Sequence, residues 1–385
     1  LKLNPIKGSM QVDFGEMLVM HNKMPRKVYA FCAKLCHSKT EFVKVYPYQR
    51  TEYFFDGLNS AFAFFKGVPH EIIFDNLKPA VKEVLEGPER VLQDEFLKFK
   101  SFYCFDATFC GPGKGNEKGM IENLVKYVRN NYFLPYPEFT DFETLNSWLL
   151  KQCLKRLEKG IHDGEPWAKL LLQEDFLPFE DIYEYARIKD AAVDTYQLIH
   201  VDRNRYSVPT RYVGKKVQVR IYPFRIVVSY KGEVVAEHDR LFGRDKENLN
   251  PYHYLSLLQK KARAYDQAKV IADWKLPAVY EEYHRQLKAH LQSNSKGTRE
   301  FIDILKLTES YGLSTIGKIL KKLDEIGQYG FQAVLSQLRY QTECTRSRRP
   351  LAEEHLDALN IGDIKTSHLP LSAYDSLAME GGCRP

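Results

Sequence analysis

The stretch FCGPGKGNEKGMIENLVKYVRNNYF, residues 109–133, decides how we interpret the fold of this chain. Glycine or proline occupies most of its opening positions (Gly111, Pro112, Gly113 and Gly115), a density that is typical of a loop. From about Gly119 onward the pattern becomes helical. The sequence therefore predicts a loop that passes directly into a helix.

This helix is expected to have two different sides. Its apolar residues recur every three or four positions and form one stripe: Ile121, Leu124, Val125, Val128 and Tyr132. Glu122, Lys126 and Arg129 share the opposite side, and Lys114 and Lys118 precede them in the loop. One carboxylate among cations suits a site that holds a metal ion and a phosphodiester together. A solvated helix face with a Glu–Lys pair four residues apart explains the same segment equally well.

Two aspartates upstream lie in segments that resemble strands. Residues 8–20 alternate apolar and polar side chains and place Asp13 between Val12 and Phe14, and residues 70–75 end an apolar run on Asp75. Aspartate is disfavoured in strands, although a strand end or a turn accounts for either residue taken singly. Together with Glu122 they form a set of hard oxygen ligands that suits Mg²⁺ or Mn²⁺.

Three motifs in this order carry a resemblance to a known family. QVDFGE at 11–16, FDN at 74–76 and GNEKGMIEN at 115–123 resemble the DDE transposases, whose catalytic core is RNase H-like, as in retroviral integrases. Asp13, Asp75 and Glu122 fall on the three catalytic acids of that family. The chain is most similar to the IstA transposases of two-gene bacterial insertion sequences, through further motifs in residues 161–179, 204–220 and 273–277.

The resemblance implies a function and a set of partners. It implies a polynucleotidyl transferase that cuts transposon ends and joins the 3′-hydroxyl to target DNA, with two Mg²⁺ or Mn²⁺ ions held by the three acids. It also implies an AAA+ ATPase helper of the IstB type, a homodimer or homotetramer on DNA, and a location in the bacterial cytoplasm at the nucleoid. This family has a helix-turn-helix region ahead of the core, which we expect this sequence to lack. A nuclease or resolvase that cleaves without joining, and a DNA-binding scaffold without catalysis, are the alternatives.

Composition adds weaker constraints. A chain of 385 residues with 44% hydrophobic residues predicts two or three domains, and a net charge of +6 argues only weakly for nucleic acid. Seven cysteines, an odd number in mostly apolar context, indicate reduced thiols. Cys32, Cys36 and His37 could suggest a zinc site, but a buried strand explains them better because no second pair stands at ligand spacing. The sequence shows no signal-peptide pattern, and we expect no apolar run long enough to span a membrane.

Residues 1–159 predict the RNase H-like core. Strands are expected at 27–36 and 41–46, a helix at 50–65, a second helix at 91–102 and a short strand near 104–105. Four residues of the first helix have the spacing of core residues: Phe54, Leu58, Phe62 and Phe65. Asp106 and Glu117 compete with Glu122 for the role of third acid. Thr140 and Glu143 form a plausible capping box for a helix that ends near 157.

The remaining chain is expected to form four further regions. Residues 160–194 predict a connector, 195–245 a small SH3-like β-barrel, 246–345 an α-helical region, and 346–385 a flexible tail that could dock a partner. In the barrel, alternation points Val217, Val219 and Ile221 inward. Four cations of the barrel are candidate phosphate contacts, although a solvated basic face explains them equally well: Arg203, Arg205, Lys216 and Arg220.

Overall fold

The computed structural model describes residues 7–21, 23–74, 81–84, 90–109 and 115–347. Asp75, Lys114 and the predicted tail beyond residue 347 therefore lie outside the described residues. The chain divides into two compact units, residues 1–250 and residues 251–385. Each unit is considered by itself below.

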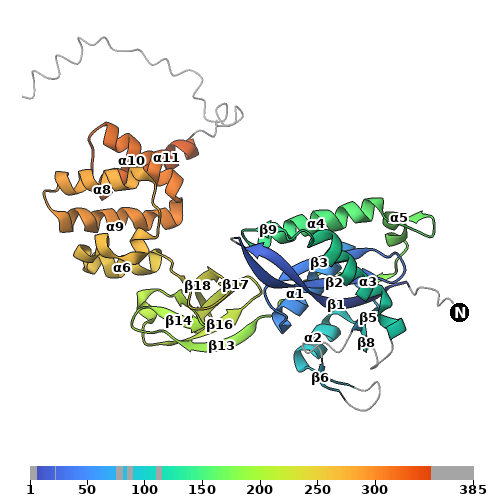
Figure 1. The fold of residues 1–385 in the computed structure, drawn as a ribbon. Helices are drawn as coiled ribbons and strands as arrows, with labels where there is room; N and C mark the ends of the chain where they lie inside the picture. Colours follow the sequence, from blue (N-terminus) through green and yellow to red (C-terminus); the bar gives the residue numbers. More distant parts are fainter. Residues whose placement is uncertain (1–6, 22, 75–80, 85–89, 110–114, 348–385) are drawn as a thin grey trace, which may run out of the picture. The chain divides into compact units, whose positions relative to one another are not determined.

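A mixed sheet is the centre of the first unit (Figure 1). Its strands lie in the order β3 (Glu41–Tyr46), β2 (Met24–Leu35), β1 (Ser9–His21), β5 (Glu71–Phe74) and β8 (Asp106–Phe109). The first three strands pair antiparallel, whereas β5 and β8 continue parallel to β1, and β9 (Glu138–Phe139) pairs with the far end of β1. Three antiparallel strands followed by two parallel ones are the order expected for an RNase H-like core.

Helices cover both faces of this sheet (Figure 1). Met10 and Val12 of β1 point into a core shared with α1 (Thr51–Phe65) and α2 (Asp94–Tyr103). Met17 and Val19 point into a second core shared with α3 (Gly115–Tyr132) and α4 (Phe142–Lys159). Because successive residues of a strand face opposite sides, β1 supplies both cores. The four residues of α1 that were expected in the core are all buried.

Some element boundaries differ from the expectations. The helix α3 begins at Gly115, not at Gly119, so the last of the four glycine or proline positions belongs to the helix. The helix α2 begins at Asp94, because β7 (Arg90–Leu92) pairs with β6 (Val81–Val84) just before it. Cys104 ends α2 in a left-handed conformation with φ 59°, and β8 starts two residues later, at Asp106.

Helix α4 protects the open edge of the sheet. The predicted capping box is wrong in detail: the N-cap is Asp141, whose Oδ1 accepts from the Thr144 amide at 2.7 Å. Further along α4, the Asn146 side chain accepts from the Val45 amide at 2.7 Å and donates to the Val45 carbonyl at 3.0 Å. Val45 lies on the edge strand β3, so Asn146 occupies backbone groups that another strand could otherwise pair with.

The segment predicted as a connector packs against the core. It contains β10 (Ile161–His162), β11 (Glu165–Pro166), α5 (Trp167–Leu171) and β12 (Phe176–Leu177), which pairs with β4 (Val68–Pro69). Beyond β12, the Tyr185 ring meets Phe55 of α1 at 4.9 Å between centroids. The aromatic residues of this segment therefore pack against the hydrophobic core of the first unit.

The β-rich region begins earlier than predicted. A four-stranded antiparallel sheet contains β13 (Arg187–Ala192), β16 (Lys216–Ile221), β17 (Arg225–Tyr230) and β18 (Glu233–Asp239), so its first strand lies inside the predicted connector. A second sheet contains β14 (Leu198–Val201), β15 (Asn204–Ser207) and β19 (Glu247–Asn248). The inward orientation of Val217, Val219 and Ile221 is confirmed, because all three are at most 2% exposed.

The second unit is helical. Its longer helices are α6 (Tyr252–Lys260), α8 (Ala278–His290), α9 (Asn294–Tyr311), α10 (Leu313–Glu325) and α11 (Phe331–Ser347). Short turns of helix at Ala262–Gln267 and in α7 (Lys269–Ala272) follow α6. The core of this unit includes Tyr280, Tyr283 and Ile302. Among the described residues, no helix is long and apolar enough to cross a membrane.

A buried histidine makes the stability of the second unit depend on pH. His284 stacks on Phe301 with ring centroids 4.2 Å apart, and its Nε2 lies 3.1 Å from Thr298 Oγ1. The pKa of His284 is lowered from 6.5 to about 4, chiefly by burial and in smaller part by the charge of Lys288, while Asp266 opposes the shift. In the unfolded chain, His284 binds a proton below about pH 6.5. In the folded unit, it stays neutral until the pH falls to about 4. The contribution of His284 to the free energy of unfolding is therefore fully present above pH 6.5. It falls by about 3 kcal/mol as the pH decreases to 4.

Calorimetric unfolding of the chain at a series of pH values checks this prediction. The transition of the helical unit should move to lower temperature between pH 7 and pH 4.5. In a His284→Gln variant, which does not titrate, that shift should shrink. An equal shift in both proteins would mean that other groups cause the acid sensitivity.

Candidate active site

Three alternate residues of β1 face helix α3. Gln11 Oε1 accepts from the Ile121 amide at 3.2 Å. A Cβ built on Gly15 would lie 2.7 Å from Cγ1 of Val125, so the missing side chain lets α3 approach the strand closely. Asp13 lies between these two residues on the same face of β1. Its carboxylate therefore points toward the α3 side of the sheet.

Helix α3 brings Glu122 to the same region. Ile121, Leu124, Val125, Val128 and Tyr132 are buried, as the predicted stripe requires. Glu122 follows Ile121 directly and is exposed at the border of this packed face. The Ile121 amide is hydrogen-bonded to the Gln11 side chain. Glu122 is the next residue after Ile121, and Asp13 lies two residues after Gln11. The structure thus brings two of the three predicted acids onto adjoining surfaces of β1 and α3.

The third predicted acid, Asp75, lies outside the described residues. Strand β5 ends at Phe74, whose Cα partner on β1 is Val12. Asp75 directly follows Phe74 in the sequence, and Asp13 directly follows Val12. The described parts of β1 and β5 therefore end their parallel pairing immediately before both aspartates.

The local contacts of Asp13 restrict its carboxylate. Asp13 is half-buried, and its Oδ1 accepts from the Phe14 amide at 2.7 Å. On the neighbouring strand, Cys32 is the Cα partner of Asp13. Burial raises the pKa of the Cys32 thiol, and the charge of Asp13 raises it further. Cys32 is fully buried in β2, which favours a buried-strand role for it over the zinc site.

The competing acids have other surroundings. Asp106 begins β8 and pairs with Lys100 at 3.3 Å, with its own side chain 86% exposed. Glu117 lies in the second position after the start of α3, and its side chain is outside the described residues. Asp106 lies at one end of β8 and Phe109 at the other. Phe109 is the partner of Phe74 on β5, so Asp106 lies at the end of β8 away from Phe74.

The cations predicted near the acids divide into three groups. Lys126 and Arg129 are exposed on α3, and an Nη2 of Arg129 donates to the Glu16 carbonyl of β1 at 3.4 Å. The backbone of Lys118 belongs to α3, but its side chain is not among the described ones. Lys114 is outside the described residues altogether. The described part of α3 therefore offers two cations beside Glu122.

Two of the four predicted cations of the β-rich region are already engaged within the fold. Arg205 pairs with Glu247 at 3.1 Å, and half-buried Arg220 donates to Ser229 Oγ at 3.4 Å. Arg203 and Lys216 are exposed. Arg220 lies on β16 next to β17, and its side chain reaches Ser229 of that strand.

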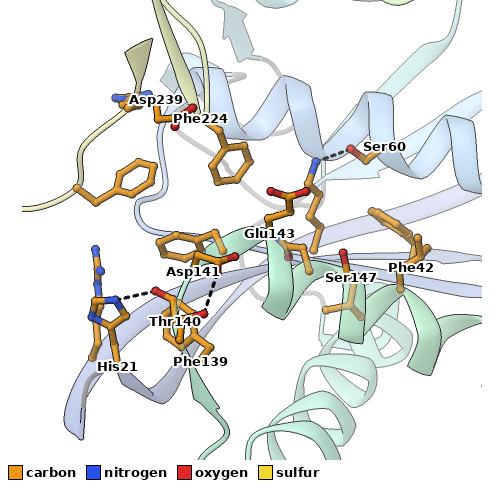
Figure 2. Close-up of a pocket in the computed structure, with 18 of the residues that line it drawn as sticks. His21, Phe42, Ser60, Phe139, Thr140, Asp141, Glu143, Ser147, Phe224 and Asp239 are labelled. Carbon is orange, nitrogen blue, oxygen red and sulfur yellow. Dashed lines mark hydrogen bonds between the residues drawn. The ribbon is translucent and has the colours of Figure 1, made fainter. Parts of the chain in front are cut away.

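A pocket lies elsewhere in the first unit, away from the predicted acids. This pocket of about 1080 Å³ is lined by residues of β3, α1, α4 and the β-rich region, and contains neither Asp13 nor Glu122. Phe224 extends into it toward the side of α4 that carries Glu143 and Ser147, and Phe139 lies across from it (Figure 2). Lys44, one of its cations, is held by Asp56 at 2.6 Å and by Ser60 at 3.0 Å. The pocket lies apart from the predicted acids.

Gln11 and Gly15 were not recognised as site residues from the sequence. Both belong to the alternating pattern of β1, which shows that they share a face with Asp13. Their partners, Ile121 and Val125, are more than a hundred positions away. Sequence spacing gives no sign of that contact.

Comparisons with known proteins show which proteins the chain is similar to. Residues 177–250 match the family model of the Mu transposase C-terminal domain. A transposase of Aminobacter aminovorans is 33% identical over 78% of this chain and 59% of its own length. The transposase for insertion sequences IS1326/IS1353 of Pseudomonas aeruginosa is 32% identical over 80% of this chain and 62% of its own. That for IS21 of the same organism is 29% identical, over 65% of this chain and 66% of its own.

Among solved structures, the HTLV-2 integrase catalytic core in complex with magnesium resembles 44% of this chain and 99% of its own, with 15% identity and a TM-score of 0.31. The chain spans about three fifths of the length of the first two relatives, 59% and 62%. By sequence, the chain is a homologue of the transposases of IS1326-type and IS21-type insertion sequences.

Proposed function

We propose that this chain catalyses metal-dependent phosphoryl transfer on DNA: cleavage at transposon ends, followed by transfer of the 3′-hydroxyl into target DNA. The observation that supports the proposal is the β1–α3 contact, in which Gln11 and Gly15 flank Asp13 on β1 and Ile121 immediately precedes Glu122 on α3. Similarity to insertion-sequence transposases supports the proposed reaction class. Asp75 is proposed as the third acid, because it directly follows the last residue of β5 that pairs with β1.

The residues at this place suit a divalent cation. Asp13 and Glu122 offer hard carboxylate oxygens, and the half-buried setting of Asp13 limits its freedom while Glu122 stays open to solvent. We propose that Asp13, Asp75 and Glu122 hold Mg²⁺ or Mn²⁺, two ions when substrate is present. When bound, these ions would supply activation of the attacking water or 3′-hydroxyl and would offset charge on the phosphate.

The protein's own groups position the acids and attract the DNA. The Phe14 amide holds one oxygen of Asp13 and thereby orients the other. Lys126 and Arg129, with Lys114 and Lys118, place positive charge next to the acids and would bind the phosphodiester backbone. Arg203 and Lys216 are proposed as further backbone contacts, with Arg205 and Arg220 in supporting positions.

The finer organisation is part of the proposal. We propose that the region 195–245, extended to include β13 and β19, is an SH3-like barrel that contacts DNA, and that 1–159, 160–194, 246–345 and 346–385 form the core, connector, helical region and tail. We also propose a dimer or tetramer that joins two transposon ends, an AAA+ ATPase helper of the IstB type, and action at the bacterial nucleoid.

A joining assay tests the proposed reaction. Labelled, pre-cut transposon-end DNA and a plasmid target are incubated with the protein and either Mg²⁺ or EDTA, and joined product is resolved on a gel. Joined product is expected with Mg²⁺ and none with EDTA. Cleaved but unjoined DNA would favour a nuclease or resolvase. DNA binding without either product, with or without metal, would favour a non-catalytic scaffold.

A further inference from the structure

One buried hydrogen bond connects strand β1 to helix α3 beside the two described acids. Gln11 is only 9% exposed, and its Oε1 accepts from the amide of Ile121, which is 6% exposed, at 3.2 Å. Gln11 precedes Asp13 by two residues on the same face of β1. Ile121 immediately precedes Glu122. The bond therefore joins the side chain of Gln11, two residues from Asp13, to the backbone of Ile121, which adjoins Glu122.

Two further contacts between the described parts of β1 and α3 constrain this arrangement less. Apolar packing of Val125 against Gly15 holds the helix on the strand, but such packing has no preferred direction along the strand. Arg129 reaches the Glu16 carbonyl only at 3.4 Å and near the other end of the helix. A hydrogen bond has a defined length and direction, so the Gln11 contact sets where α3 lies along β1.

We propose that Gln11 is a positioning residue that holds the beginning of α3, and with it the Glu122 carboxylate, at a fixed place relative to Asp13. Gln11 does not contact the reacting atoms in this scheme. Its effect on the reaction rests on the proposed function, whereas its effect on α3 does not. Metal sites require their ligands within about 0.5 Å of the productive geometry, so a small shift of α3 is sufficient to weaken metal binding.

Amide hydrogen exchange of the metal-free, full chain tests the effect on α3. Gln11→Leu keeps a similar volume and removes the acceptor, and amides in residues 115–125 are expected to exchange roughly tenfold faster. Gln11→Glu keeps an acceptor at the same reach and should retain slow exchange. Asn146→Leu is the matched control, since it removes another amide side chain that binds backbone in the same core. It should leave exchange in α3 unchanged.

The metal requirement tests the effect on the site. In Gln11→Leu, the Mn²⁺ concentration for half-maximal joining is expected to rise roughly 10- to 100-fold, as for other residues that orient a metal ligand. Saturating Mn²⁺ should restore most of the rate. A merely structural loss would lower the rate at every metal concentration, as expected for Asn146→Leu.

Two results would overturn the proposal. One is slow exchange of residues 115–125 in Gln11→Leu, equal to that of the parent. The other is accelerated exchange spread equally over β1, β2 and β3, which would indicate general destabilisation. If the parent protein forms no joined product, the proposed function fails, but the exchange experiment still decides whether Gln11 fixes α3.

Discussion

Replacing Glu122 with glutamine is expected to reduce joined product to background while the protein stays folded and still binds DNA. Glutamine has almost the same size but lacks the negative charge and one of the hard oxygens that a divalent cation prefers. A metal ion contributes several kcal/mol to stabilising charge in the transition state, so its loss corresponds to roughly a thousandfold lower rate or more. The joining assay with Mg²⁺ measures the rate, and a gel-shift assay measures DNA binding.

Two further variants make this result specific. Glu158→Gln changes an exposed glutamate of α4, a neighbouring helix, and should join DNA at the parental rate. Asp106→Asn removes the competing acid at the start of β8, and it too should remain active. Loss of joining in Asp106→Asn together with activity in Glu122→Gln would show that the third acid is assigned wrongly. Asp13→Asn should behave as Glu122→Gln does.

The core elements could be predicted because their patterns are local. Alternation in β1 and the nearly continuous apolar run of β2 follow directly from which faces are buried, and β3 was predicted with its observed bounds. The start of α3 was predicted late, since glycine signals a loop although Gly115 is tolerated in the first turn. Strand β13 was missed because only two of its six residues are even half-buried, so its sequence shows no apolar alternation.

The candidate site shows the same limit. Sequence motifs located Asp13 and Glu122, and the structure brings them to one side of the sheet. The partners of the cations could not be predicted in this way. Arg205 forms an ion pair with Glu247 of β19, the last strand of the β-rich region in the sequence. This ion pair depends on tertiary structure, because β19 lies about forty residues after Arg205 in the chain. A basic pattern in sequence does not distinguish such an arginine from one that is available to DNA.

Replacing Arg240 with alanine is expected to lower the free energy of unfolding of the first unit by about 3 to 5 kcal/mol. Arg240 follows β18 in the β-rich region and is 2% exposed, as is its partner Glu52 in helix α1 of the core. Its guanidinium donates to Glu52 at 2.9 Å, to Asp202 at 2.8 Å and to the Tyr222 carbonyl at 2.8 Å. Truncation leaves the Glu52 carboxylate buried without its closest cation. Removing one partner of such a pair costs far more than an exposed ion pair contributes.

Thermal unfolding measures the effect, with a fall in Tm of roughly 6 to 20 °C expected for a unit of this size. Arg225→Ala is the matched control, because this arginine lies in the same region, pairs with Glu184 and Glu237, and is 47% exposed. Its Tm should change little. In the double variant Glu52→Gln with Arg240→Met, both charges are absent, so most of the loss should be recovered. A double variant as unstable as Arg240→Ala would show that the hydrogen bonds of Arg240 to Asp202 and to the Tyr222 carbonyl, and not the uncompensated charge of Glu52, account for the loss.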